Sequence, residues 1–203
     1  MLQTQTIQPK LLELLTKIMS SEVFRGFNLV GGTSLALQIG HRFSIDIDMF
    51  GNCEVDEYEF IEELSKFGKP TILKKSKNII IVSIDGIKVD FVNYKYPLLE
   101  DIKTIENIRL VSDKDIAAMK LNAIAGRGSR KDFIDLYFLL KKYSLNKMLD
   151  FYKQKYIDGS EFMVIKSLNY FEDADSEEMP IMFEKISWNE IKIEISRLAK
   201  NLI

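Results

Sequence analysis

The residue types that build most metal and hydrolase sites are scarce in this chain of 203 residues. Cys53 is the only cysteine and His41 the only histidine. A disulfide within the chain and a zinc site of clustered cysteine and histidine are therefore excluded. A Ser-His-Asp hydrolase would depend on His41 alone. We interpret His41 as a capping or surface residue at a helix end.

Net charge and long apolar runs are also lacking. A formal charge of −2 gives no overall field that attracts nucleic acid, so any RNA contact must be local. No apolar run approaches the roughly 18–20 residues that span a bilayer. Residues 1–10 are polar and lack the apolar core of a signal peptide. We expect a cytoplasmic protein with no membrane segment.

The pattern of apolar residues changes near Ile108. Upstream, helices are predicted over 8–19, 33–39 and 56–67, and strands over 27–30, 45–50, 70–73, 78–84 and 87–94. Downstream, only helices are predicted, over 113–125, 131–142, 145–156, 161–168 and 188–202, with an acidic loop over 171–179. The pattern predicts an α+β fold, with an α/β domain over 1–108 and a helical domain over 109–203.

Two carboxylates, Asp46 and Asp48, alternate with apolar residues in the strand predicted over 45–50. Residues two apart on a strand share a face and lie about 6.6 Å apart. Both can then reach metals about 3.5–4 Å apart in a two-metal site, and hard oxygen ligands suit Mg²⁺. The alternative is an edge strand whose polar face lies in water. The other two Asp-x-Asp pairs, at 113/115 and 173/175, fit a helix start and a solvated loop.

A glycine turn precedes this strand and favours the metal interpretation. Gly31 and Gly32 let the backbone approach an anion closely, at the start of a predicted helix whose free N–H groups bind phosphate. The Thr33 and Ser34 hydroxyls add donors. Such a turn some fifteen residues before the carboxylates is typical of a site for a metal-bound triphosphate.

Further polar residues lie on neighbouring elements. Asp90 falls on the polar face of the strand over 87–94, beside Lys88, where it could complete a metal shell or be a simple exposed aspartate. In the helical half, Asp132 and Asp135 form an acidic stripe on an otherwise apolar helix. That stripe needs a cationic partner or a ligand, and both interpretations stay open.

Together these motifs resemble the AbiEii/AbiGii-type nucleotidyltransferases, the toxins of type IV toxin–antitoxin and phage-abortive systems. The resemblance rests on residues 31–48, on Lys88-Val89-Asp90, on Lys120 and on residues 127–136, and extends to 171–174 and Trp188. It implies a polymerase-β-like nucleotidyltransferase fold. In that fold a mixed sheet bears the Asp-x-Asp pair, and a C-terminal helical bundle domain closes the active-site cleft.

The resemblance also implies roles for individual residues. Gly31, Gly32 and Thr33 would hold the phosphates, Asp46 and Asp48 would be metal ligands, and Asp90 would be the third carboxylate. Lys120 would contact the triphosphate. Asp132 would be the acid of the last motif, with Asp135 as its companion and Arg127 and Lys131 as contacts to phosphate or RNA.

We therefore expect a Mg²⁺-dependent enzyme that moves NMP from an NTP to an acceptor hydroxyl through a two-metal site. RNA, above all tRNA, is the expected acceptor. Action as a toxin implies a cognate antitoxin, of a winged-helix type. Two alternatives stay open: a nucleotide-binding or antitoxin-like module without turnover, and a transferase that modifies a small molecule such as an antibiotic.

Overall fold

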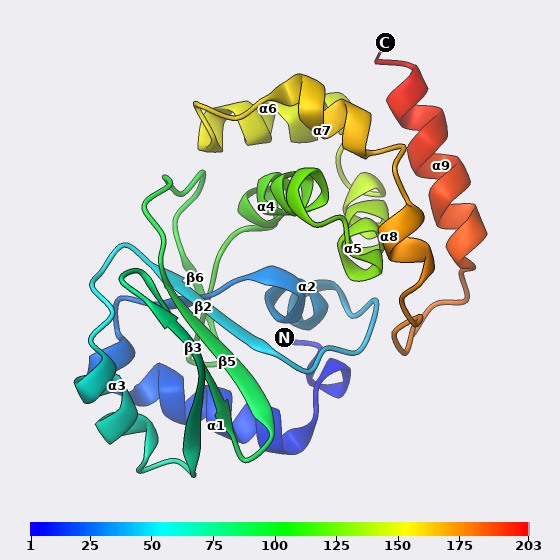
Figure 1. The fold of residues 1–203 in the computed structure, drawn as a ribbon. Coiled ribbons are helices and arrows are strands. Elements are labelled where there is room, and N and C mark those ends of the chain that lie inside the picture. Colours follow the sequence, from blue (N-terminus) through cyan, green and yellow to red (C-terminus); the bar gives the residue numbers. More distant parts are fainter. Residues whose placement is uncertain (203) are drawn as a thin grey trace. The chain divides into compact units, whose positions relative to one another are not determined.

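The computed structural model describes residues 1–202 and divides into two compact units (Figure 1). Unit 1 comprises Met1–Gly40, Ser44–Tyr96 and Asp101–Val111. Unit 2 comprises His41–Phe43, Pro97–Glu100 and the chain from Ser112 onward. Two short segments, 41–43 and 97–100, therefore leave unit 1 and join unit 2 before the chain returns. We call these segments the two excursions.

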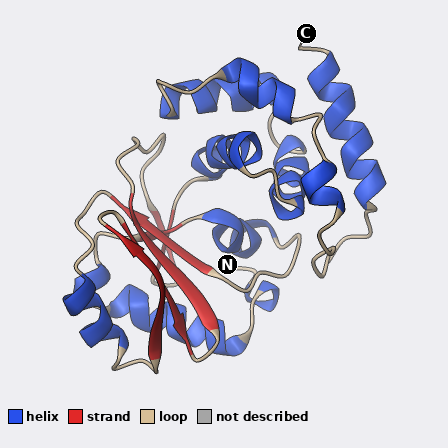
Figure 2. Ribbon diagram, in the orientation of Figure 1, coloured by secondary structure: helices blue, strands red, loops and turns tan. Residues whose placement is uncertain are grey.

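Unit 1 is built on a seven-stranded mixed sheet, drawn in red in Figure 2. Its strands are β1 (Asn28–Leu29), β2 (Ile47–Gly51), β3 (Pro70–Ser76), β4 (Ile79–Ile84), β5 (Ile87–Asn93), β6 (Lys103–Ile105) and β7 (Ile108–Leu110), in the order β3-β4-β5-β2-β1-β7-β6. The pairs β2/β5 and β1/β7 are parallel, and the others are antiparallel. The helices are η1 (Thr4–Thr6), α1 (Pro9–Ser20), η2 (Glu22–Phe24), α2 (Gly31–Ile39) and α3 (Glu57–Leu64).

One face of this sheet forms the core of unit 1. Helix α1 begins with Pro9 at its first turn, where no backbone donor is lost. Its apolar residues recur at helical spacing and are buried: Leu11, Leu14, Leu15 and Ile18. They pack with α3 against alternate residues of the strands, Ile47, Met49, Val89 and Phe91 among them. The residues between these, Asp48 and Asp90 included, therefore lie on the opposite face, which we call the open face.

Unit 2 contains α4 (Asp113–Gly126), α5 (Arg130–Leu140), α6 (Leu145–Lys155), α7 (Glu161–Ser167), α8 (Glu172–Asp175) and α9 (Trp188–Lys200). Helix α4 packs against α5, α6 and α7, and α5 packs against α8 and α9 (Figure 1). Serines cap four of these helices, because each serine hydroxyl accepts the backbone N–H three residues later: Ser112, Ser144, Ser160 and Ser187.

Both excursions are fixed inside unit 2 by buried charges. In the first, Arg42 binds Asp135, and Phe43 N donates to Ile181 O at 2.8 Å. In the second, Lys155, only 1% exposed, donates to Pro97 O and to Asp115 Oδ1, each at 2.7 Å. Asp115 is fully buried and also accepts from the Ser112 hydroxyl, so its ionised form is well compensated.

The structure confirms most predicted elements. Gly40, with φ of +74°, is the C-terminal cap of α2. Three expectations were wrong. Strand β2 begins at Ile47, and Ile45 is 56% exposed, because the alternation starts two residues later than predicted. The short hairpin β6/β7 was missed. Residues 172–175 form helix α8 within the predicted acidic loop.

No helix within residues 1–202 has the length and apolar character to cross a membrane.

Candidate active site

The glycine turn of unit 1 lies against a carboxylate. Gly31 opens α2 with φ of +67°, a left-handed conformation that disfavours side chains. A Cβ at Gly31 would lie 2.6 Å from Asp48 Oδ2, so a side chain there would displace the carboxylate. Val30 N donates to Asp48 O at 2.9 Å and fixes the two chains beside each other. The start of α2 and the Asp48 carboxylate are thus held together.

The two hydroxyl residues of the turn point inward. Thr33 is 1% exposed, and its hydroxyl contacts Ser44 Oγ at 2.8 Å and also donates to the Asp46 carbonyl. Ser34 is fully buried and accepts from Gln38 Nε2 at 3.1 Å. In this structure these side chains connect α2 to the segment that leads into β2. Their predicted role as phosphate donors stays a prediction.

Three predicted acids lie on or beside two neighbouring strands. Asp48 and Asp90 are directly opposite each other in the parallel pair β2/β5, and Asp46 precedes β2. All three are partly buried. Lys88 Nζ lies 2.6 Å from Asp90 Oδ1 and 2.7 Å from Oδ2, but only Oδ2 has hydrogen-bond geometry. Asp90 Oδ1 is thus a buried acceptor without a hydrogen bond among the described residues.

No group of three or more His, Cys, Asp or Glu side chains in residues 1–202 is arranged as a metal-binding cluster. The structure brings Asp48 and Asp90 into adjacent register but does not show a three-carboxylate cage. Their role as metal ligands stays a prediction, to be judged below on the donors present.

The predicted site residues of unit 2 form a separate buried ion network. Lys120, 5% exposed, lies 2.9 Å from Asp132 Oδ1 and 2.6 Å from Asp135 Oδ2. Both aspartates are fully buried. Arg127 Nε donates to Asp132 Oδ2 at 2.8 Å, although 70% of the Arg127 side chain is exposed. The structural ion pairing that the sequence left open is therefore present, whereas contact of these residues with a substrate stays a prediction.

Two members of this network were not predicted. Arg42 binds Asp135 through Nε at 2.6 Å and Nη2 at 2.9 Å, a bidentate pair. His41 Nε2 lies 2.7 Å from Asp135 Oδ1, and His41 is 1% exposed, so its interpretation as a capping or surface residue was wrong. A histidine and arginine directly after a helix-ending glycine gave no periodic signal, because the excursion they occupy belongs to no regular element.

The pKa values of this network favour charged pairs. Burial alone would raise the pKa of Asp132 and Asp135, but the cations beside them hold both pKa values below the ordinary range. Burial alone would lower the pKa of Lys120, but Asp135 and Asp132 raise it. For His41, burial outweighs the attraction of Asp135 and lowers the pKa, so the ring is neutral at pH 7.

Arg127 and Lys131 are exposed at the two ends of the α4–α5 turn, whereas Arg130 between them donates to Ala174 O at 2.9 Å. Their proposed contact with phosphate or RNA is thus compatible with their exposure but is not tested by it.

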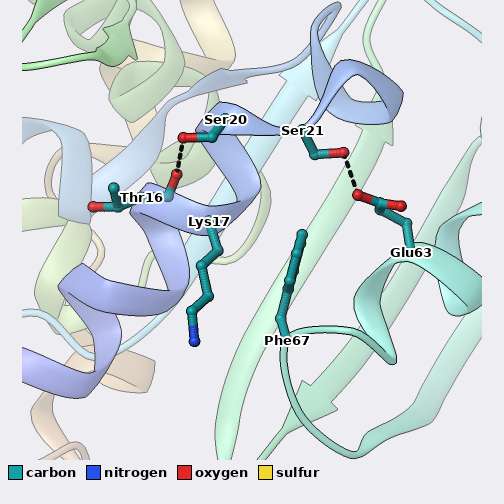
Figure 3. Close-up of a pocket in the computed structure, with 6 residues that line it drawn as sticks. All are labelled: Thr16, Lys17, Ser20, Ser21, Glu63 and Phe67. Atoms are coloured by element: carbon teal, nitrogen blue, oxygen red, sulfur yellow. Dashed lines mark hydrogen bonds between the residues drawn. The ribbon is translucent and has the colours of Figure 1, made fainter.

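A pocket of about 300 Å³ lies on the other side of the sheet, between α1 and α3. Figure 3 shows its lining: Thr16, Lys17, Ser20, Ser21, Glu63 and Phe67. The Ser21 hydroxyl donates to Glu63 Oε1 at 2.8 Å, which closes one side of it. It contains none of the predicted site residues.

The mixed sheet with its glycine turn and paired aspartates has the polymerase-β-like fold of nucleotidyltransferases, which the similar solved structures share. The model of the family "Nucleotidyl transferase AbiEii toxin, Type IV TA system" matches residues 13–104 and 78–201. The chain belongs to this family and is a nucleotidyltransferase. The predicted family and fold are confirmed.

Relatives of this chain include proteins from three bacteria. Protein aq_aa25 of Aquifex aeolicus, whose function is uncharacterised, is 39% identical over 199 residues, which cover 94% of this chain and 95% of that protein. The crystal structure of JHP933 from Helicobacter pylori is similar, with a TM-score of 0.60, 17% identity, and 95% and 88% of the two chains covered. The nucleotidyltransferase toxin MenT4 of Mycobacterium tuberculosis H37Rv has a TM-score of 0.60 at 14% identity, covering 95% and 82%.

Proposed function

We propose that this nucleotidyltransferase moves NMP from an NTP to a hydroxyl group of RNA, tRNA above all, in a Mg²⁺-dependent reaction. One observation carries the proposal: the Asp48 carboxylate lies against Gly31 at the start of α2 and opposite Asp90 on the next strand. A helix start that favours phosphate and a carboxylate pair that favours a metal thus share one place in unit 1.

The start of α2 supports a phosphate site. The first N–H groups of a helix have no partner within it, and the helix dipole adds positive potential there. Helix α2 runs for nine residues, from Gly31 to Ile39, with no acidic side chain in its first turn. A triphosphate placed at this end would therefore meet backbone donors. The neighbouring Asp48 carboxylate would repel it unless a cation lay between them.

The donors present fit Mg²⁺. Asp48 and Asp90 supply hard oxygen ligands from neighbouring strands, and the Lys88 ammonium, 2.6 Å from Asp90 Oδ1, shows that Asp90 binds a cation here. Mg²⁺ in phosphoryl-transfer sites is commonly bound by one or two carboxylates and completed by substrate phosphates and water. A cage of three protein carboxylates is therefore not required. Bound there, Mg²⁺ would neutralise the triphosphate and orient its α-phosphate.

The reaction forms one bond and breaks one. The acceptor oxygen bonds to the α-phosphorus, the bond from that phosphorus to its leaving bridging oxygen breaks, and pyrophosphate leaves with the electron pair. The hydroxyl proton passes to a carboxylate, which we assign to Asp90. Most of the rate acceleration would come from positioning and charge neutralisation.

The biological part of the proposal follows from the family. The family implies a cognate antitoxin. We propose action in the cytoplasm, where the proposed substrates, NTP and RNA, are found. We also retain Arg127 and Lys131 as RNA or phosphate contacts. Lys120 as a triphosphate contact, Asp132 as the acid of the last motif and Asp135 as its companion remain proposals, since their charges already compensate one another inside unit 2.

The test is incubation of the protein with each α-³²P-labelled NTP, Mg²⁺ and total bacterial RNA. Label on RNA, lost in the Asp46→Ala/Asp48→Ala variant and on chelation with EDTA, would support the proposal and identify the nucleotide. Label found only on protein or on an added aminoglycoside would show that this molecule, and not RNA, is the acceptor. NTP binding with no transfer to any acceptor would favour the non-catalytic module.

A further inference from the structure

An aromatic row lies on the open face of the unit 1 sheet, formed by Phe50, Tyr94 and Tyr96. The ring centroids of Phe50 and Tyr94 are 5.0 Å apart, and those of Tyr94 and Tyr96 are 5.1 Å apart. Tyr96 is 50% exposed, and Phe50 and Tyr94 are partly exposed. The three rings therefore form a continuous surface that water can reach.

This row continues directly from the carboxylates. Phe50 follows Asp48 by two residues on β2. Tyr94 follows Asp90 by four residues and lies directly after the end of β5, so the alternation puts all four side chains on the open face. Tyr94 N donates to Gly51 O at 2.7 Å, which extends the pairing of the two strands by one residue. The separation of Asp48 and Phe50 along the strand is about 7 Å. The row lies toward the carboxyl ends of two parallel strands, where ligands of α/β sheets commonly bind.

This row is distinct from the aromatic core of unit 1. The core aromatic rings of unit 1 are on the other face and are at most 2% exposed: Phe24, Phe27, Phe60 and Phe91. Phe91 and its neighbour Val92 alternate between the two faces. The sequence thus places a second aromatic set beside charged carboxylates, where burial stabilises it less.

We propose that Phe50 and Tyr94, with Tyr96 at the rim, stack a nucleobase of one of the enzyme's substrates. This inference rests on the proposed nucleotidyl transfer. In a nucleotide, the ribose lies between the base and the phosphate. The aromatic row lies one strand repeat from Asp48, which leaves space for a ribose between a base on the row and a phosphate near Asp48. Aromatic side chains bind bases of any sequence through their π-faces. The base belongs either to the donor NTP or to the end of the acceptor RNA, and both sources present the same chemistry to the row.

The test is equilibrium binding of single ligands, so that no transfer can occur. The probes are the four NTPs, inorganic triphosphate, an eight-nucleotide single-stranded RNA, and the same RNA with an abasic 3′ nucleotide. We expect Phe50→Leu and Tyr94→Leu each to weaken binding of a base-bearing ligand about 5- to 100-fold. Inorganic triphosphate should bind unchanged, and the abasic RNA should lose the effect of the substitutions. Tyr94→Phe, which keeps the ring, should bind as the parent protein does.

Tyr58→Leu is the matched control. Tyr58 is 87% exposed on α3, which packs on the other face of the sheet, so its loss should leave all binding unchanged. Weaker binding of NTPs alone assigns the base to the donor, and weaker binding of the intact RNA alone assigns it to the acceptor. Unchanged binding of every ligand by folded Phe50→Leu and Tyr94→Leu overturns the inference.

A measurement on the unchanged protein tests the inference even if the variants fail to fold. Photo-cross-linking with 8-azido-ATP or 4-thiouridine RNA should label the tryptic peptide 89–95, which contains Tyr94. Labels confined to other peptides, with none at Phe50 or Tyr96, overturn the inference. The two proposals fail separately: label transfer with unaffected binding removes only the stacking site, whereas base-dependent binding without label transfer removes only the transferase reaction.

Discussion

The aspartates of unit 1 and those of unit 2 have different surroundings. Asp48 and Asp90 are partly exposed on the open face, where Asp90 pairs with Lys88, a lysine whose side chain is 41% exposed. Asp132 and Asp135 are fully buried, and Lys120 binds both. Arg42 and Arg127 complete this second set.

The difference separates two uses of the same side chain. A buried carboxylate between cations gains little from a ligand, because its charge is already compensated, and it would leave an unpaired charge if removed. A partly exposed carboxylate beside a helix start can still exchange water for a metal or a phosphate-bound cation. The comparison therefore predicts that substituting an aspartate of unit 1 lowers activity with little change in stability. Substituting an aspartate of unit 2 should lower stability.

The largest expected effect is on catalysis in unit 1. Asp48→Asn should lower the rate of label transfer roughly 10³-fold or more, because the isosteric amide is a poor metal ligand. Its free energy of unfolding should change by less than about 1 kcal/mol, since the substituted side chain is partly exposed. Single-turnover transfer and urea unfolding measure the two quantities. Asp173→Asn, at an exposed aspartate of α8, is the control, and persistent transfer by Asp48→Asn would contradict the site.

Next is the stability of unit 2. Asp135→Asn leaves Arg42 and Lys120 without their shared carboxylate and should lower the free energy of unfolding by about 3–5 kcal/mol. Urea unfolding gives the value. Glu184→Gln, which breaks the exposed pair with Lys141, should cost at most about 1 kcal/mol. A fully stable Asp135→Asn variant that cannot transfer label would instead make Asp135 part of the active site.

A smaller effect on stability is expected at Gly31, where the backbone lies against the Asp48 carboxylate. Gly31→Ala adds a Cβ at a φ of +67° and 2.6 Å from Asp48 Oδ2, so it should cost about 1–2 kcal/mol of stability and also displace the carboxylate. Gly86→Ala provides the matched control, because Gly86 has φ of +88° but no atom within 4 Å of the added Cβ. Both variants should lose stability, and only Gly31→Ala should lose transfer activity.

The smallest effect is a pH dependence. His41 has a lowered pKa, so the unfolded chain binds its proton first as the pH falls below about 6.5. The free energy of unfolding should therefore decrease from pH 7 toward pH 5. Because His41 is the only histidine, His41→Gln should remove this step. Unfolding curves across the range measure it, and an identical slope in the variant would contradict the assignment.

Below that pH range, two aspartates determine how the free energy of unfolding depends on pH. Asp132 and Asp135 have lowered pKa values, so their contribution is complete above the unfolded value of about 3.9 and is lost as the pH falls further. A second decrease in stability should begin near pH 4.

The sequence predicted the parts whose chemistry is local. The alternation around Asp48 and the turn at Gly31 followed from spacing alone, and the structure places both as neighbours. The open question at Asp135 could not be answered from sequence, because its partner Arg42 is 93 residues away. His41 was misread for the same reason. Hairpin β6/β7 was missed because its strands have three residues each, too few for an alternating pattern.

The two excursions imply an order in which the two units fold during synthesis. The ribosome completes the sequence of unit 1 at Val111, but residues 41–43 and 97–100 emerge long before their partners Asp135, Asp115 and Lys155. Unit 1 can therefore fold first, as N-terminal regions commonly do during synthesis, while both excursions wait for the helices. A fragment begun at Ser112 would lack both excursions and leave Asp135 without Arg42. Unit 2 is thus the second part to fold, and a fragment that contains only its helices is incomplete.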